Sequence, residues 1–126
     1  MGNEVRDNLK YTENHEWAKI QENKVTVGIT DHAQSELTDI VFIELPEVGK
    51  EFKKGDELCV VESVKSVSEI YAPVSGKVVK VNSQLEDAPE NINSSPYEEG
   101  WLVELEVADK SEIDSLMDAE SYKKII

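Results

Sequence analysis

The chain has 126 residues, with 27 acidic and 13 basic side chains, so its formal net charge at pH 7 is −14. Binding to nucleic acids or to anionic membranes is disfavoured, because such binding needs clustered Lys and Arg. Apolar residues make up 39% of the chain, enough for a folded protein with a modest core. We expect a single monomeric domain over residues 1–126, with an N-terminal segment at 1–10 and a helical part at 108–126.

Cys59 is the single cysteine of the sequence, so neither a disulfide framework nor a cysteine-based zinc site can be built from the chain. It lies in a predicted strand, where a free cysteine packs as a small apolar side chain, and we expect a buried and inert thiol. The apolar runs of the sequence are far too short to span a membrane. Residues 1–6 contain no apolar signal-peptide core, which predicts a cytoplasmic protein or a processed organelle protein.

Two strands are expected at the start of the ordered part. Residues 17–20 favour a strand, residues 21–23 a turn, and residues 24–30 alternate between apolar and polar side chains. Gly28 lies inside the second strand, where a glycine indicates a bulge or a close approach of another group.

A short helix and a third strand follow. The helix is predicted over residues 31–37, because Thr30 or Asp31 can cap its first turn. The strand is predicted over residues 39–45, and Pro46 ends it. Both faces of this strand are expected to be partly buried, with Val41, Ile43 and Leu45 on one side and Ile40 and Phe42 on the other.

The most informative stretch is a predicted hairpin over residues 56–72. Its strands are the apolar run 58–61 and the run 67–71, and the turn falls at residues 63–66. Lys65 therefore projects into water from the hairpin tip. An exposed lysine amine can be acylated, which mounts a cargo on a long stem. The alternative is an ordinary solvated lysine, which composition alone favours.

Residues 47–56 are expected to form a loop. The segments 45–50 and 72–77 resemble one another, because in each a strand stops at a proline and a Gly-Lys pair restarts the chain. This faint internal repeat is consistent with two similar β-layers packed face to face.

The C-terminal half contains two more predicted strands, at residues 77–81 and 101–107. The polar stretch 82–100 between them is expected to be a long loop with a helical turn near its start, and a loop of this length is usually functional or packs on the body. A helix is predicted from Asp109, with an apolar stripe formed by Ile113, Leu116 and Met117. A second short helix is expected from about Ala119, with Tyr122 and Ile126 facing inward.

Support for catalysis is weak. His15 and His32 lie in different elements and do not have the spacing of a metal-ligand pair. The sequence contains no Gly-x-Ser-x-Gly, P-loop or Gly-x-Gly-x-x-Gly motif. The residues alone therefore favour a carrier over an enzyme, and a plain β-sandwich interaction module with an unmodified Lys65 stays open as an alternative.

Taken together and in this order, several segments resemble the glycine cleavage system H protein family, whose members are lipoyl carriers. The resemblance extends from Tyr11 to the C-terminal helices. The segments are Tyr11-Thr12 with His15-Glu16-Trp17, residues 27–34, Asp39-Ile40-Val41-Phe42 with Glu44-Leu45-Pro46, Glu62-Ser63-Val64-Lys65, residues 72–76, and residues 93–97 with Gly100-Trp101. The departures are mild: Thr38 replaces a glycine, Ser66 an alanine and Glu69 an aspartate that are usual in the family.

The resemblance implies a mainly β fold, a hybrid β-sandwich of the lipoyl- and biotinyl-carrier type. A short helix follows the second strand, the lysine hairpin lies at one end, and the C-terminal helices pack outside. Lys65 is then the residue that carries lipoate covalently, as N6-lipoyllysine. Glu62, Ser63 and Val64 are expected to shape the turn and to be recognised by the lipoylating enzyme. The remaining expected site residues form an arm-holding groove and are Glu16, His32 and Glu69.

The family's partners imply a shuttle role. A pyridoxal-phosphate glycine decarboxylase (P protein) loads an aminomethyl group, and a tetrahydrofolate-dependent aminomethyltransferase (T protein) removes it. Dihydrolipoamide dehydrogenase (L protein) reoxidises the arm, and lipoylating enzymes attach it. Two carrier alternatives are an H-like relay of lipoyl groups to other complexes and a biotin carrier. The second is disfavoured, because biotinylated lysines usually lie between methionines and Lys65 lies between Val64 and Ser66.

Overall fold

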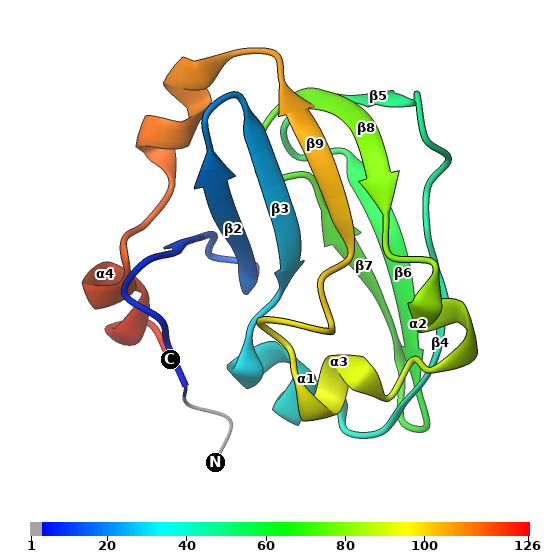
Figure 1. Ribbon diagram of the computed structural model, residues 1–126. Helices are drawn as coiled ribbons and strands as arrows, with labels where there is room; N and C mark the ends of the chain where they lie inside the picture. The colour runs from blue at the N-terminus through cyan, green and yellow to red at the C-terminus, as the bar shows by residue number, and fades with distance from the viewer. Residues whose placement is uncertain (1–3) are drawn as a thin grey trace.

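The computed structural model describes residues 4–126, and within them the chain forms two antiparallel β-sheets that face one another (Figure 1). The protein is therefore mainly β, a β-sandwich with few helices, as expected. The large sheet has the strand order β1-β2-β3-β9-β8-β5, and the small sheet has the order β4-β6-β7. The first three residues of the predicted N-terminal segment lie outside the described residues.

The strands follow the predicted order closely, with the two-residue strands β1 and β5 as additions. They are β1 (Lys10–Tyr11), β2 (Glu16–Gln21), β3 (Lys24–Ile29), β4 (Ile40–Glu44), β5 (Glu51–Phe52), β6 (Glu57–Ser63), β7 (Val67–Tyr71), β8 (Gly76–Val81) and β9 (Val103–Val107). The helices are α1 (Asp31–Leu37), α2 (Gln84–Asp87), α3 (Asn91–Ser94), the 3₁₀ helix η1 (Lys110–Ser115) and α4 (Ala119–Lys123). No helix among residues 4–126 is long and apolar enough to cross a membrane.

The main core lies between the two sheets. Alternate residues of β3 and β9 point into it, and these strands pair in register, with Val25 opposite Leu105 and Val27 opposite Val103. The small sheet contributes Ile43 and Val61 from directly opposite positions on β4 and β6. This core fixes the small sheet, and with it the hairpin that β6 and β7 form.

The prediction for β4 was wrong in one respect. Ile40 pairs with Ser63 of β6, and Phe42 pairs with Glu62, the adjacent residue of β6. β4 therefore has one extra residue, Val41, at this point, as in a β-bulge. Ile40 and Ile43 are therefore both buried, whereas Val41 and Phe42 are both exposed. A strict two-residue period cannot place these four side chains, because the bulge changes the phase of the strand.

The long stretch 82–100 packs on the body, one of the two expectations for it, and it holds two helical turns rather than one. Leu85 of α2 and Ile92 of α3 are fully buried in the main core. The predicted helix after Asp109 is the 3₁₀ helix η1, and the Asp109 side chain accepts a hydrogen bond from the Ser111 N–H (3.0 Å). The expected loop over residues 47–56 is interrupted by β5, a strand too short to show a period.

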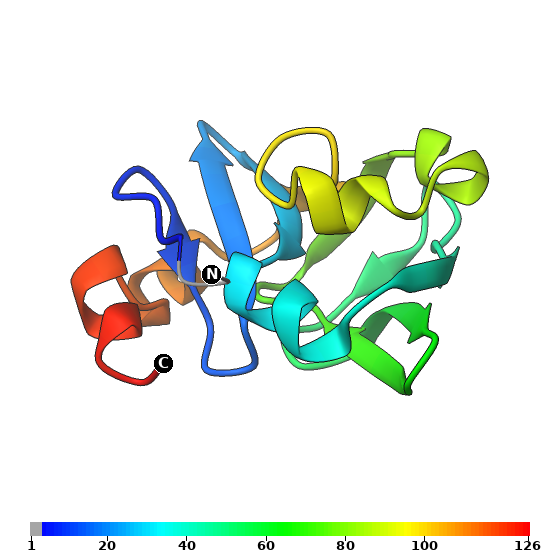
Figure 2. The same cartoon turned by 90° about the horizontal axis from the view of Figure 1, so that it is seen from below.

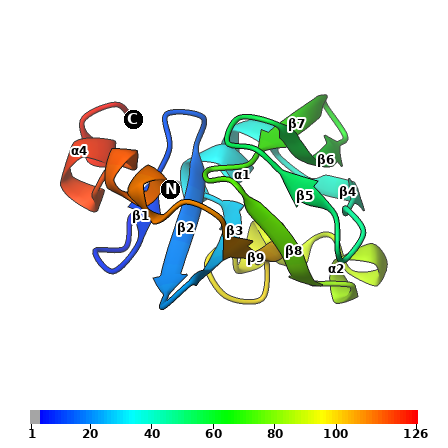
Figure 3. The ribbon, with the colours of Figure 1, turned by 90° about the horizontal axis from the view of Figure 1, so that it is seen from above.

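The two similar segments have similar paths. Each leaves an edge strand of the small sheet, β4 or β7, and leads into β5 or β8, which pair with one another in the large sheet. The faint repeat therefore corresponds to two crossings between the layers. Figure 3 shows the small sheet on the side of the molecule away from α4.

A second group of buried side chains lies on the outer side of the large sheet, which we call the aromatic cluster. Tyr11 and Tyr122 stack with ring centroids 4.6 Å apart, and the Trp17 indole N–H donates to the Pro96 carbonyl (2.9 Å). An added Cβ on Gly28 would lie 2.5 Å from the Trp17 ring, which explains this glycine as a close approach rather than a bulge. The helix α4 is held here, because Tyr122 is fully buried.

Candidate functional site

The lysine hairpin has its turn where the sequence predicted it, between Ser63 at the end of β6 and Val67 at the start of β7. The Ser63 N–H donates to the Ser66 carbonyl (2.8 Å). The Ser63 hydroxyl oxygen accepts from the N–H groups of Lys65 (3.2 Å) and Ser66 (3.0 Å). One serine therefore satisfies the backbone of the turn, and Lys65 is left exposed at the tip.

The turn is also attached to the segment between α1 and β4. The Val64 N–H donates to the Asp39 carbonyl (3.0 Å), and the Lys65 ammonium lies 3.4 Å from the Glu36 carbonyl at the end of α1. Figure 2 shows the hairpin and α1 at the same end of the molecule. These contacts give the exposed lysine a fixed base.

Asn93 holds this segment from the other side. Its amide group donates to the Thr38 carbonyl (2.8 Å) and accepts from the Ile40 N–H (2.9 Å). Asn93 belongs to a motif of the family resemblance, but nothing in the sequence alone assigned it a role. The structure places it beneath the connection on which the lysine turn rests.

Thr38 ends α1 with φ 65° and ψ −148°, a backbone conformation that glycine adopts far more readily than other residues. The departure from the family pattern therefore has a physical meaning. A β-branched residue occupies a position with positive φ, directly before the Asp39 carbonyl that fixes the lysine turn.

Glu16 is a buried carboxylate, 1% exposed. The Thr12 hydroxyl donates to one of its oxygens (2.6 Å), and the Tyr71 N–H on β7 donates to the other (3.1 Å). Burial raises the pKa of the Glu16 carboxyl, and the two hydrogen bonds oppose that effect. Glu16 thus links β2 of the large sheet to β7 of the small one.

His32 lies in the first turn of α1 and contacts His15, with ring centroids 4.7 Å apart. His15 Nδ1 and the Tyr122 hydroxyl are 2.8 Å apart, and that hydroxyl also bonds the Thr30 hydroxyl (2.7 Å). Burial and the neighbouring His32 lower the pKa of His15. The two histidines are thus joined in space, a proximity that their positions in the sequence did not indicate.

The expected groove residues do not share one environment. His32 precedes Glu36, whose carbonyl meets Lys65, by four residues on α1, so both lie along the same side of the helix. Glu69 is exposed on β7, whereas Glu16 is buried behind the same strand at Tyr71. The structure therefore places His32 on the helix whose far end meets the lysine, and it separates the two acids by exposure.

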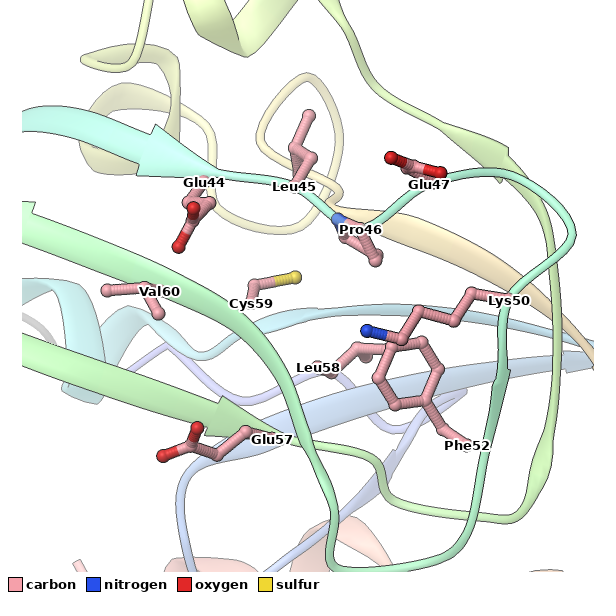
Figure 4. A pocket seen from close by; sticks show the side chains of 10 residues that line it. All are labelled: Glu44, Leu45, Pro46, Glu47, Lys50, Phe52, Glu57, Leu58, Cys59 and Val60. Atoms are coloured by element: carbon pink, nitrogen blue, oxygen red, sulfur yellow. The ribbon is translucent and has the colours of Figure 1, made fainter.

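A groove of about 520 Å³ lies at the other end of β6, away from the turn (Figure 4). Its walls include Lys50, Phe52 and Cys59. Cys59 is buried, and burial raises the pKa of its thiol to about 12, so the thiol stays protonated and unreactive near neutral pH. This agrees with the expected inert cysteine. Residues 4–126 contain no cluster of His, Cys, Asp and Glu suited to hold a metal ion.

Comparisons with known proteins agree with this geometry. The family model described as "Glycine cleavage H-protein" matches residues 9–126. The glycine cleavage system H proteins of Staphylococcus haemolyticus and Staphylococcus saprophyticus are 57% and 56% identical over 122 residues, 97% of each chain. The crystal structure of an H protein from Mycobacterium marinum matches with a TM-score of 0.85 at 36% identity, covering 95% of this chain and 97% of that one. The chain belongs to the glycine cleavage H-protein family.

Membership confirms the resemblance drawn from the motifs and makes the protein a carrier component rather than a catalytic one. The sequence found the lysine turn and its three preceding residues. It missed the supports beneath the turn, Asn93 and the Asp39 carbonyl, because a backbone carbonyl has no sequence signal and an asparagine in a polar stretch has many interpretations.

Proposed function

We propose that this protein is the lipoyl carrier of a glycine cleavage system, with the lipoyl group on Lys65. The observation that carries the proposal is the exposed amine of Lys65 on a turn whose backbone is fixed by Ser63 and by Asp39. In this role the protein takes an aminomethyl group from the pyridoxal-phosphate decarboxylase to the tetrahydrofolate-dependent transferase. Dihydrolipoamide dehydrogenase then restores the arm, and we place the carrier in the cytoplasm.

The residues present fit such a group. The Lys65 side chain is exposed, so its amine has only to leave the Glu36 carbonyl to be acylated, and hydrogen bonds to the Ser63 hydroxyl hold the backbone of the turn. When bound, lipoate supplies a reducible disulfide at the end of a long arm. The chain itself holds the base of that arm still and leaves its length free to reach partner sites.

For the loaded arm we propose a resting path along α1. The Lys65 ammonium already points to the Glu36 carbonyl, and His32 follows four residues back along the helix. Glu69 is exposed and lies close to Lys65 in sequence, so its carboxylate can pair with a cationic cargo. Glu16 acts as a positioning residue, because its carboxylate holds β7 at Tyr71.

The test is an intact mass, with peptide mapping across Lys65, after co-expression with a lipoate ligase and lipoate. The proposal expects one lipoyl increment, on Lys65 alone. Lys65→Arg should abolish it, and the matched control Lys24→Arg, an exposed lysine at the β2–β3 turn, should not. A folded wild-type protein that stays unmodified while the ligase modifies a control carrier would overturn the proposal.

Reconstitution with glycine decarboxylase separates shuttling from lipoyl relay. We expect the lipoylated protein to support glycine-dependent release of CO₂ and Lys65→Arg to support none. Lipoylation without any activity in this assay would leave only the relay role.

A further inference from the structure

The outer face of the small sheet carries side chains in two rows set by the strand register. Directly opposite residues across β4, β6 and β7 share a face. The rows are Phe42, Glu62 and Val67, and next to it Glu44, Val60 and Glu69. We call these six residues the hairpin face.

The hairpin face exposes large apolar side chains among its glutamates, where a solvated sheet face is normally polar throughout. Phe42 is 52% exposed and Val67 56% exposed, and both lie in the row that borders the turn. Val64 at the tip is exposed as well. An exposed apolar patch rimmed by charged residues marks an interaction site more often than it occurs by chance.

This face is continuous with the lysine. Glu62 comes directly before Ser63, and Val67 directly after Ser66, so the first row forms the base of the turn that presents Lys65. The bulge in β4 turns Phe42 outward beside them. A protein that approaches the Lys65 amine from this side meets Phe42 and Val67.

We infer that the hairpin face is the docking surface for the enzyme that acylates Lys65, and that this enzyme covers it with an apolar patch bordered by Lys and Arg. The inference rests on the proposed function, because it presupposes that Lys65 is acylated. It adds Phe42, Val67, Glu44 and Glu69 to the residues that the acylating enzyme contacts.

The short length of the unmodified Lys65 side chain is the reason to assign this face to the acylating enzyme. Before acylation the amine is only a lysine stem away from a turn fixed by Ser63, so the acylating enzyme must bring its active site against the turn and its flanking strands. Enzymes that act on the far end of the finished arm can work at an arm's length. The three glutamates of the face, in a chain of net charge −14, select a basic rim on the partner.

The test uses steady-state lipoylation of the full-length protein by a lipoate ligase with lipoate and ATP. Phe42→Thr with Val67→Thr keeps residues that favour strands and removes the apolar patch. We expect kcat/KM to fall at least tenfold, mostly through KM. The matched control is Val48→Thr, a valine that is 61% exposed in the loop after β4 and is expected to stay within twofold of wild type.

A second experiment tests the charged residues of the hairpin face. Glu44→Gln with Glu69→Gln should raise KM and flatten its dependence on salt, whereas Glu104→Gln with Glu106→Gln on β9 should do neither. Unchanged kinetics in both hairpin-face variants would overturn the inference. So would a dimer in sedimentation that Phe42→Thr with Val67→Thr dissociates, since a second copy would then cover the face. A wild-type protein that an active ligase cannot modify would instead refute the proposed function itself.

Discussion

The lysine hairpin and the aromatic cluster lie on opposite sides of the molecule and are built in opposite ways (Figure 1). At the turn of the hairpin the side chains of Val64, Lys65 and Ser66 are exposed, and hydrogen bonds of the backbone and of Ser63 hold the shape. In the aromatic cluster Tyr11, Trp17 and Tyr122 are buried, and their polar atoms are paired inside.

The difference separates stability from function. Burial of large aromatic side chains contributes strongly to the free energy of unfolding, whereas an exposed turn contributes little. Changes in the cluster should therefore alter stability and spare acylation, and changes at the hairpin should do the reverse. Helix α1 is where the two meet, because Thr30 bonds Tyr122 at its start and Glu36 meets Lys65 at its end.

The largest effect is expected from Trp17→Ala. Removal of the buried indole leaves a cavity and an unpaired Pro96 carbonyl, and should lower the free energy of unfolding by about 3–5 kcal/mol. Urea unfolding measures this. The matched change at the hairpin, Val64→Ala, should alter stability by less than about 0.5 kcal/mol. Equal losses from both substitutions would remove the contrast between the two regions.

Gly28→Ala is expected to have the next largest effect. The new methyl group would lie 2.5 Å from the Trp17 ring, and such overpacking costs about 1–3 kcal/mol. Thermal or urea unfolding measures the loss, and the lipoylation rate of the folded protein should be unchanged. If the clash is the cause, the smaller ring of Trp17→Phe should reduce the cost of Gly28→Ala in the double variant; strict additivity would point to another cause.

The hairpin and most strands could be predicted from the sequence, because alternation and proline positions record them directly. The bulge in β4 and the two-residue β5 could not, since a local phase change and a very short strand leave no period. The position of Lys65 followed from its turn and from the family motif. The burial of Glu16 did not follow, because a carboxylate on a strand is read as exposed unless its partners, here Thr12 and Tyr71, are known.

Thr38→Gly tests the end of α1, the helix that contacts both the lysine hairpin and the aromatic cluster. This substitution is expected to stabilise the protein by about 1 kcal/mol. Relief of the positive φ favours the folded state by about 1–3 kcal/mol, and the greater freedom of glycine in the unfolded chain offsets part of this gain. Thr38→Ala keeps the Cβ and serves as the control, with no gain expected. A destabilised Thr38→Gly variant would show that the threonine side chain holds the segment beneath the lysine turn.

The smallest expected effect is a pH dependence of the free energy of unfolding. It decides whether the Glu16 carboxylate is buried or available to the lysine arm. Burial raises the pKa of Glu16 above its ordinary 4.5 in the folded state, so the folded protein binds this proton more tightly than the unfolded chain does. Its contribution to stability is then fully present below pH 4.5 and is lost as pH rises through the higher folded pKa. Glu16→Gln removes this titration: its amide oxygen can still accept from the Tyr71 N–H, and its NH2 group can face the Thr12 hydroxyl only with the direction of that hydrogen bond reversed. Its stability relative to wild type should rise over that interval.

Urea unfolding of both proteins at a series of pH values from 4 upward measures the change, with the exposed Glu69→Gln as control. If the two variants follow the same pH course, Glu16 is solvated in solution and its carboxylate is available to the lysine arm. If only Glu16→Gln gains stability relative to wild type as the pH rises, the Glu16 carboxylate is buried in solution. It then influences the arm through the position of β7.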